Sequence, residues 1–266
     1  MLYRLTISMG GALLCSLPAS AVAQQAQSPA FLGIAHVAIR VKNVEASRDF
    51  YQRLGFQQFF AFEKDGHPTE SFLKVNDRQF LELYPTTEAE PTPGFLHLCF
   101  EGQDLNALHD FDVAQGLTPT AVRKAGAGNL LFTLRGPENQ NIEYTQYMPG
   151  SRHTLDRGQH LGADRIADNF YAVGLSMKDV AAATDYYTQR LRFARIGHSH
   201  TLLLPGTSGE QVVVIPYTGP QSRIYMHVPN LKQAARELKQ RGLAASSGHK
   251  QLLLTDPDGN QLLLTR

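Results

Sequence analysis

The stretch "GIAHVAIRVKNVEASRDFYQRLGF", residues 33–56, joins a strand pattern to a helix pattern. Residues 34–41 are apolar with few interruptions, as expected of a buried strand. A helical pattern follows and stops at Gly55. Its apolar positions are Val44, Phe50, Tyr51 and Leu54. Further strand-like segments at residues 57–62, 71–75 and 79–84 complete a β-α-β-β-β unit.

The pattern then begins again. A shift of 61 residues places Gly55 on Gly116 and His36 on His97. The segment "GFLHLCFEGQDLNALHDFDVAQGL" repeats the first strand and the helix, and "NLLFTLRGPENQNIEYTQY" repeats the later strands. Self-similarity at a fixed spacing indicates repeated structural units.

Two further units follow. One begins near Asn169, where "TDYYTQRLRF" echoes "RDFYQRLGF", and another begins near Ser222 and closes with a turn at Asp258-Gly259. The sequence therefore predicts an α+β fold of four βαβββ units in two pairs, each pair a curved mixed β-sheet with flanking helices. An alternative would pair the first unit with the fourth and the second with the third.

The N-terminal segment is predicted to be separate from this fold. Arg4 precedes a short apolar stretch, and Ala21-Val22-Ala23 forms a small-x-small cleavage site before Gln24. This layout is typical of a secretory signal peptide over residues 1–23, and it places the protein in the periplasm or outside the cell. The alternatives are an uncleaved anchor and a misassigned start.

The mature chain is expected to have two domains. A flexible leader at 24–30 precedes a first domain at 31–147 and a second at 169–266, with a linker at 148–168 that is rich in Gly, Arg and His. Cleavage would leave Cys99 as the single cysteine, so we expect no internal disulfide.

The overall charge argues against two classes of partner. The net charge is +1, and 18% of the residues are charged. No basic field therefore favours nucleic acid or, after cleavage, an anionic membrane surface. We expect a small-molecule ligand and a monomer or homodimer.

Two histidine–glutamate pairs occur at the same spacing. Glu82 follows His36 by 46 residues, and Glu143 follows His97 by the same distance. Each His lies on the first strand of its unit and each Glu on the last. If the two units pack symmetrically, the four groups converge and suit a divalent transition metal. The alternative is two hydrogen-bonded core histidines and two strand glutamates.

The segments "GIAHVAIRVKNVEASRDFYQRLGF" and "GPENQNIEY" resemble the vicinal oxygen chelate superfamily. This superfamily includes glyoxalase I, methylmalonyl-CoA epimerase, fosfomycin-resistance thiol transferases, bleomycin-binding proteins and extradiol dioxygenases. The resemblance covers residues 31–266 and implies U-shaped half-barrel sheets around one divalent metal per chain, whether Zn, Ni, Mn or Fe. The ligands that it implies are His36, Glu82, His97 and Glu143. The pattern "LELYP…GFLHLCF" is most similar to glyoxalase I.

The resemblance also implies a choice of chemistry. A redox-inert metal would stabilise an enolate while Glu143 or Glu82 acts as the base, which gives an isomerase, epimerase or lyase. Ferrous iron with two His and one Glu would instead suit an extradiol ring-cleaving dioxygenase. Glu82, as a fourth ligand, favours the first. A non-catalytic, resistance-type binding protein is the third possibility. Because a glutathione adduct would be an unusual substrate outside the cytoplasm, we predict the reaction type and leave the substrate open.

Strand alternation extends the prediction to the pocket walls. Residues two positions from a ligand share its face of the sheet. The substrate-binding candidates found in this way are Arg40, Phe80, Tyr84, Cys99 and Asn141. Arg40 could pair with a substrate carboxylate or be a surface charge, Tyr84 could donate a hydrogen bond or pack in the core, and Cys99 could be a small buried filler.

The second pair of units does not carry the ligand pattern. Ala172 stands in place of His36, Val214 in place of Glu82 and Leu263 in place of Glu143, while the position of His97 falls between Arg223 and Tyr225. We therefore expect the second domain to be free of metal.

Overall fold

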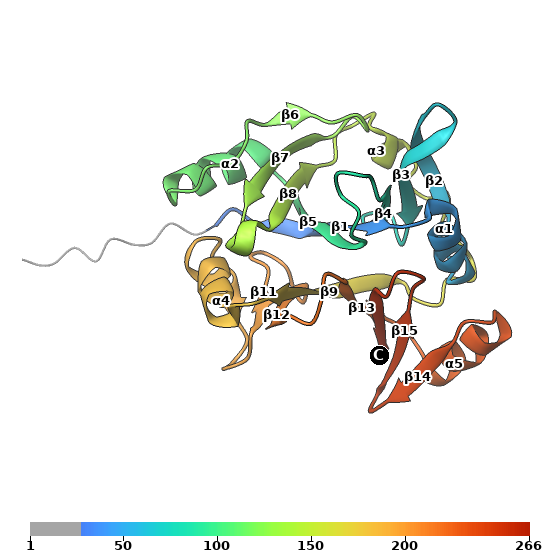
Figure 1. Ribbon diagram of the computed structural model, residues 1–266. Helices are drawn as coiled ribbons and strands as arrows, with labels where there is room; N and C mark the ends of the chain where they lie inside the picture. The colour runs from blue at the N-terminus through green and yellow to red at the C-terminus, as the bar shows by residue number, and fades with distance from the viewer. Residues whose placement is uncertain (1–27) are drawn as a thin grey trace, which may run out of the picture.

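The computed structural model describes residues 28–266 (Figure 1). The predicted signal peptide and the first residues of the leader lie outside the described residues. Within the described part of the chain, no helix is both long enough and apolar enough to cross a membrane.

The first half of the fold contains two βαβββ units that form one eight-stranded sheet. The strand order is β2-β3-β4-β1-β5-β8-β7-β6. The first unit consists of β1 (Phe31–Val41), α1 (Val44–Arg53), β2 (Gln58–Lys64), β3 (His67–Lys74) and β4 (Phe80–Pro85). The second consists of β5 (Gly94–Gly102), α2 (Leu105–Ala114), β6 (Arg123–Lys124), β7 (Leu130–Arg135), the 3₁₀ turn η1 (Pro137–Asn139) and β8 (Asn141–Gln146).

The second half repeats this topology after a short helix, α3 (Arg152–Leu155). The strand order is β10-β11-β12-β9-β13-β16-β15-β14. The third unit consists of β9 (Asn169–Met177), α4 (Val180–Gln189), β10 (Ala194–Arg195), β11 (Thr201–Leu203) and β12 (Gln211–Pro216). The fourth consists of β13 (Arg223–His227), α5 (Leu231–Gln240), β14 (Ala245–Gly248), β15 (Gln251–Thr255) and β16 (Gln261–Thr265).

These sheets confirm the predicted α+β fold of four units in two pairs. The first unit joins the second where β1 runs antiparallel to β5, and the third joins the fourth where β9 runs antiparallel to β13. The alternative pairing of the first unit with the fourth is therefore excluded. In each sheet the two central strands are flanked by parallel partners, β4 and β8 in the first and β12 and β16 in the second.

Each unit starts its helix in the same way. An Asn or Asp precedes the helix, and its side chain accepts a hydrogen bond from the backbone N–H three residues later. This bond satisfies one of the otherwise unpaired N–H groups of the first turn. The four capping residues are Asn43, Asp104, Asp179 and Asn230. A repeated cap fixes where each first strand ends and its helix begins.

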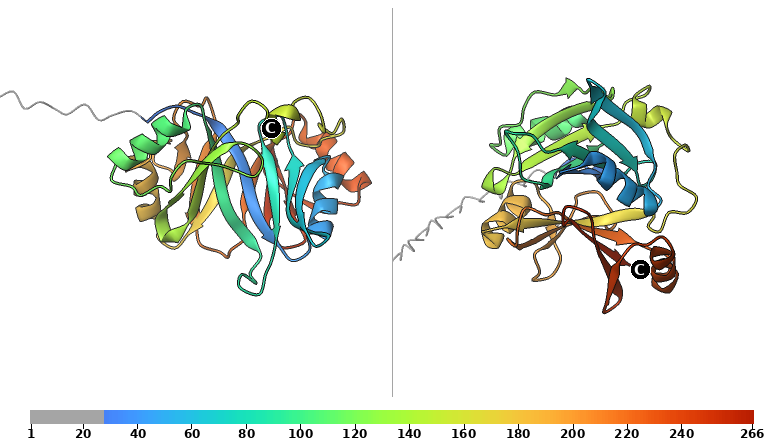
Figure 2. Two further views of the ribbon diagram at one scale, coloured as in Figure 1. Left: turned by 90° about the horizontal axis from the view of Figure 1, so that it is seen from above. Right: turned by 45° about the vertical axis from the view of Figure 1, so that its right-hand side comes forward.

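The two sheets share one apolar core. The bases of the two U-shaped sheets lie against each other and their open sides face in opposite directions (Figures 1 and 2). Phe193 of the second half packs edge-on against Phe31 and Phe100 of the first, with ring centroids 5.8 and 5.5 Å apart. At the start of β5, Gly94 permits close approach, since a Cβ there would lie 2.2 Å from the carbonyl oxygen of Pro220.

The strand register of the second sheet corrects one sequence prediction. In the first sheet Ala38 lies opposite Glu82 and His97. Its equivalent in the second sheet, Gly174, lies opposite Val213 and Arg223. Val213, not Val214, therefore stands where Glu82 would be. The apolar run "VVVI" has no alternation, so it does not define which residues face which side.

Candidate metal centre

The four predicted ligands come together on the four central strands of the first sheet. His36 lies on β1, Glu82 on β4, His97 on β5 and Glu143 on β8. The Nε2 atoms of His36 and His97 are 3.0 Å apart. His36 Nδ1 lies 3.1 Å from Glu82 Oε1, and His36 Nε2 lies 3.4 Å from Glu143 Oε1. Glu82 Oε2 is 3.9 Å from His97 Nε2.

Burial decides the charge state of this cluster. His36, His97 and Glu82 are buried, and Glu143 is nearly so. Desolvation lowers the pKa of His97 to about 4 and lowers that of His36 well below its usual value. Desolvation also raises the pKa of Glu143 to about 7. It raises the pKa of Glu82 strongly, and the nearby carboxylates add to the effect.

This donor set fits a divalent metal ion. The imidazoles are neutral at physiological pH, so their lone pairs are free for coordination. The carboxylates are crowded and desolvated, which makes their charge unfavourable without a cation. Donor atoms of His36, Glu82 and His97 all lie within 4.8 Å of one another, as do those of His36, Cys99 and Glu143. Two imidazoles and two carboxylates are ligands suited to Zn, Mn, Fe or Ni.

A cavity of about 200 Å³ opens over this cluster. His36, Glu82 and Glu143 line it, and aromatic side chains and one cation form part of the remaining wall. These wall residues are Phe62, Phe72, Tyr84, Tyr147, His153 and Arg123. A small molecule bound here would meet carboxylate and imidazole donors on one side and ring faces on the others.

Part of the cavity wall comes from the segment that joins the two halves. His153, on α3, packs its ring 4.9 Å from that of Tyr147, nearly parallel to it. Lys74 anchors the segment from within the sheet: its fully buried Nζ donates to Asp156 Oδ2 at 2.8 Å and to the carbonyl oxygens of Asp156 and Gln159 at 2.6 and 2.8 Å. The predicted linker therefore supplies His153 to the cavity wall and is tied to the sheet at Asp156 and Gln159.

Three predicted pocket residues lie at or beside the cavity. Tyr84 lines it and donates its hydroxyl to Glu70 Oε1 at 2.5 Å, with Glu82 Oε2 at 3.2 Å. Phe80 is fully buried and packs its ring 4.6 Å from that of His153. Cys99 is also fully buried, and desolvation raises the pKa of its thiol well above the usual value. It is therefore held as a neutral thiol in the absence of a metal.

The other two predicted pocket residues lie elsewhere. Arg40 forms an ion pair with Glu90 of the loop between β4 and β5. Asn141 lines a separate cavity of about 490 Å³ between the two halves. Strand alternation assigned both residues to the correct face of the sheet but not to a position along it. Both lie near the ends of their strands, away from the cluster of candidate metal ligands.

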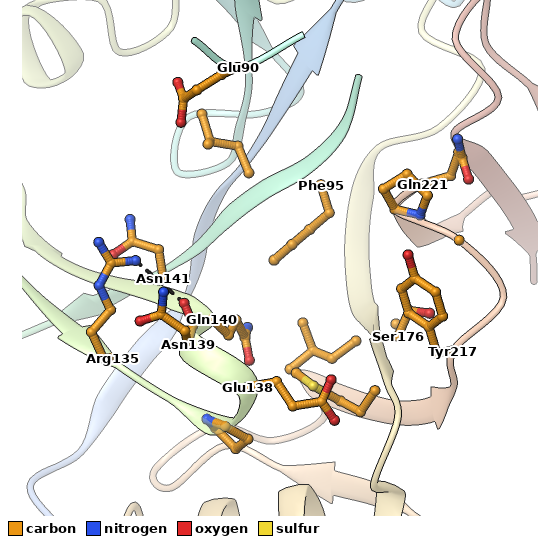
Figure 3. Close-up of a pocket in the computed structure, with 17 residues that line it drawn as sticks. Glu90, Phe95, Arg135, Glu138, Asn139, Gln140, Asn141, Ser176, Tyr217 and Gln221 are labelled. Carbon is orange, nitrogen blue, oxygen red and sulfur yellow. Dashed lines mark hydrogen bonds between the residues drawn. The ribbon is translucent and has the colours of Figure 1, made fainter. Parts of the chain in front are cut away.

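Figure 3 shows this second cavity. Asn141 stands beside Arg135 and Asn139 on one wall, and Ser176 and Tyr217 form the opposite wall from the second half. The cavity is thus built from both halves, and its polar groups do not include the metal-ligand candidates.

Sequence reasoning missed several residues of the metal-centre cavity. Tyr147 continues the alternation that starts at Glu143 and could have been found by extending that rule two positions further. Glu70 and Phe72 lie on β3, whose pairing with β4 the sequence does not specify. His153 lies in a segment without strand or helix periodicity, so no pattern pointed to it.

The comparisons with known proteins agree with the fold. Residues 33–144 match the family model of the Glyoxalase/Bleomycin resistance protein/Dioxygenase superfamily. This part of the chain belongs to that family, the vicinal oxygen chelate superfamily, as the sequence predicted, and the second half repeats its topology. No curated protein matches the chain at a significant level.

Solved structures with the same fold include both classes of enzyme considered above. The 2,3-dioxygenase LapB from Pseudomonas sp. KL28 is 16% identical, with a TM-score of 0.66 over 90% of this chain and 93% of that one. The Mn(II)-bound glyoxalase from Novosphingobium aromaticivorans is 16% identical, with a TM-score of 0.66 over 88% and 82%. An extradiol ring-cleaving dioxygenase from B. fuscum is 15% identical, with a TM-score of 0.67 over 90% and 72%.

Proposed function

We propose that this protein is an exported, divalent-metal-dependent enzyme that transfers a proton next to a carbonyl group, as an isomerase, epimerase or lyase. The observation that carries this proposal is the position of Glu82. Its carboxylate lies 3.1 Å from His36 and 3.9 Å from His97, so it supplies a fourth donor beside Glu143. A second carboxylate at the same point allows one to hold the metal while the other accepts a proton.

The metal would act as a Lewis acid toward a substrate oxygen. Glu143 and Glu82 are the candidate bases. Burial raises the pKa of Glu143 to about 7, in the range that suits proton transfer at neutral pH. A bound cation would shift both carboxyl groups toward their charged forms. The Phe62 and Phe72 rings exclude water from the reacting atoms, and Arg123 at the exposed rim favours a substrate with negative charge.

An experiment without a known substrate can test the reaction class. Metal-loaded protein is incubated in D₂O with a panel of small α-hydroxyketones and α-hydroxyaldehydes, and loss of the C–H signal next to the carbonyl is followed by NMR. We expect metal-dependent exchange in wild-type protein and none in a Glu82→Ala, Glu143→Ala double variant. Exchange that is equal in both proteins would overturn the assignment of these bases.

A ring-cleaving dioxygenase is the second candidate. His36, His97 and Glu143 would form a two-His, one-carboxylate set of the kind that binds ferrous iron, with Glu82 outside it. Iron-loaded protein is therefore also assayed for oxygen consumption with catechol and its carboxylated derivatives. Oxygen uptake without proton exchange would replace the first candidate by the second. Binding of panel compounds with neither reaction would favour a binding protein.

Export is a separate part of the proposal and rests on residues 1–24 alone. We expect the N-terminus of exported protein at or near Gln24. N-terminal sequencing that finds Met1 retained would contradict it.

A further inference from the structure

We propose that His153, on the segment joining the two halves, donates a hydrogen bond from Nε2 to an oxygen atom of the molecule bound in the metal-centre cavity. This role would make it a ligand-binding residue from outside the sheet that carries the metal donors. The inference rests on the proposed function only in taking this cavity as the substrate site.

The neighbours of His153 determine which ring nitrogen carries the proton. The backbone N–H of Met148 donates to Asn129 Oδ1 at 3.3 Å, which fixes the orientation of that amide. Asn129 Nδ2 therefore faces His153 Nδ1, at 2.8 Å. Because an amide nitrogen only donates, Nδ1 must accept. The neutral ring then carries its proton on Nε2.

That Nε2–H group has no hydrogen-bond partner among residues 28–266, although it is buried. The His153 side chain as a whole is only 4% exposed. A buried donor without a partner is unfavourable, and such groups in native proteins call for an explanation. His153 lines the cavity above the metal donors, so a bound molecule can supply the missing acceptor.

The surrounding rings restrict the rotation of the His153 ring toward another partner. Tyr147 stacks on one face, and the surrounding rings meet it edge-on at 4.6–5.8 Å. These rings belong to Phe59, Phe60, Phe72 and Phe80. Because its neighbours fix the ring and Nε2–H has no partner, His153 is preorganised to donate to a ligand.

Burial keeps the His153 ring neutral beside the charged groups that face it. Burial lowers its pKa to about 4, Asp156 partly opposes this effect, and Lys74 adds to it. A neutral imidazole with Nδ1 already occupied has one donor to offer. The ligand chemistry that this donor recognises is an acceptor oxygen, such as a carbonyl, carboxylate or ionised hydroxyl, in a molecule small enough for about 200 Å³.

The proposal is tested with 4-nitrocatechol as the probe, added to zinc-loaded full-length mature protein. Its absorbance reports binding, and ¹⁵N NMR of histidine-labelled protein reports the tautomer of His153. We compare wild type with His153→Leu, which has no donor, with His153→Gln, which keeps an N–H donor, and with His109→Leu on α2, outside the cavity, as a control. Zinc content is measured for each protein.

We expect the Nε2-protonated tautomer in wild type and a shift of its resonance on addition of the probe. His153→Leu should weaken probe binding about 10- to 100-fold with unchanged zinc content. His153→Gln should recover much of this loss, and His109→Leu should bind as wild type does.

Two outcomes would overturn the inference while leaving the proposed function intact. One is a proton on Nδ1, and the other is unchanged probe affinity in His153→Leu while wild type binds in a zinc-dependent manner. If wild type neither holds zinc nor binds the probe, the proposed function and this inference both fail.

Discussion

His36 and His97 are 61 residues apart in the chain, yet their Nε2 atoms lie 3.0 Å from each other. Each stands on the first strand of its own unit, and those two strands run antiparallel at the centre of the sheet. Both rings are neutral because burial lowers their pKa values. Two buried imidazoles facing each other beside two carboxylates form a site that a divalent cation would complete.

The role of Glu82 separates the candidate chemistries. Under the isomerase or lyase account, Glu82→Ala should lower metal affinity or reduce turnover about 10²- to 10⁴-fold, since a general base typically contributes that much. Under the dioxygenase account, Glu82→Ala should keep iron and oxygen uptake, while His36→Ala, His97→Ala and Glu143→Ala lose both. A Glu82→Ala variant with normal metal content and full turnover would contradict our preferred assignment. Metal content and activity are measured on the same preparations.

The stability of the metal-free protein should depend on pH through Glu143, His97 and His153. The pKa of Glu143 is about 7 in the folded protein and 4.5 as a free side chain, so the folded state keeps the extra proton between these values. Its contribution to stability therefore falls as pH rises toward 7, by about 3 kcal/mol in total. His97 and His153 act in the opposite direction: their pKa values of about 4 lie below 6.5, so stability rises with pH from 4 to 6.5.

Thermal unfolding of the metal-free protein from pH 5 to 9 checks this dependence. Glu143→Gln should flatten the decline on the alkaline side, and saturating metal should stabilise the wild type more at pH 8 than at pH 6. Stability of the metal-free wild type that keeps rising to pH 8 would show that the carboxyl groups are not perturbed as described.

The repeat made the fold and the convergence of the four candidate ligands predictable from sequence. The equal spacing of His36 to Glu82 and of His97 to Glu143 predicted four groups on four strands, and the structure places them together. The pocket walls were less predictable. Alternation predicts which face of the sheet a side chain lies on, but not whether it reaches the cavity. Arg40 forms an ion pair with Glu90 and does not line the cavity.

Other features depend on pairing that the chain does not encode locally. The pairing of β12 with β9 determines which residue of the second sheet is equivalent to Glu82. Because β12 is an apolar run without alternation, the sequence prediction assigned Val214, one residue away from Val213. The position of the segment that carries His153 depends on the ion pair between Lys74 and Asp156, which are 82 residues apart in the chain. Residues 148–168 have no strand or helix periodicity, so the sequence did not predict that His153 would line the cavity.

Lys74→Met should release the segment that carries His153. The change removes a fully buried cation from Asp156 and from two carbonyl oxygens, and breaking a buried ion pair of this kind costs about 3 kcal/mol. We expect lower stability and faster proteolysis within residues 148–168, monitored by mass spectrometry. Lys64→Met, at an exposed position on β2, is the matched control. Equal cleavage rates in both variants would rule out the anchoring role.

The two halves should unfold together. Phe193 is 3% exposed and packs against Phe31 and Phe100 across the interface between the sheets. Phe193→Ala should therefore destabilise the whole protein by about 3–5 kcal/mol, within a single cooperative transition. Calorimetry that resolves two transitions already in the wild type would mean that each half folds independently.

Elemental analysis of the purified protein tests the central claim most directly. The wild type should hold one divalent metal ion per chain, because the second half has Ala172, Val213, Arg223 and Leu263 at the equivalent positions. His97→Ala should hold almost none while remaining folded. A wild type that binds no metal after incubation with Zn, Mn, Ni or Fe, or a His97→Ala variant with undiminished metal content, would contradict the account.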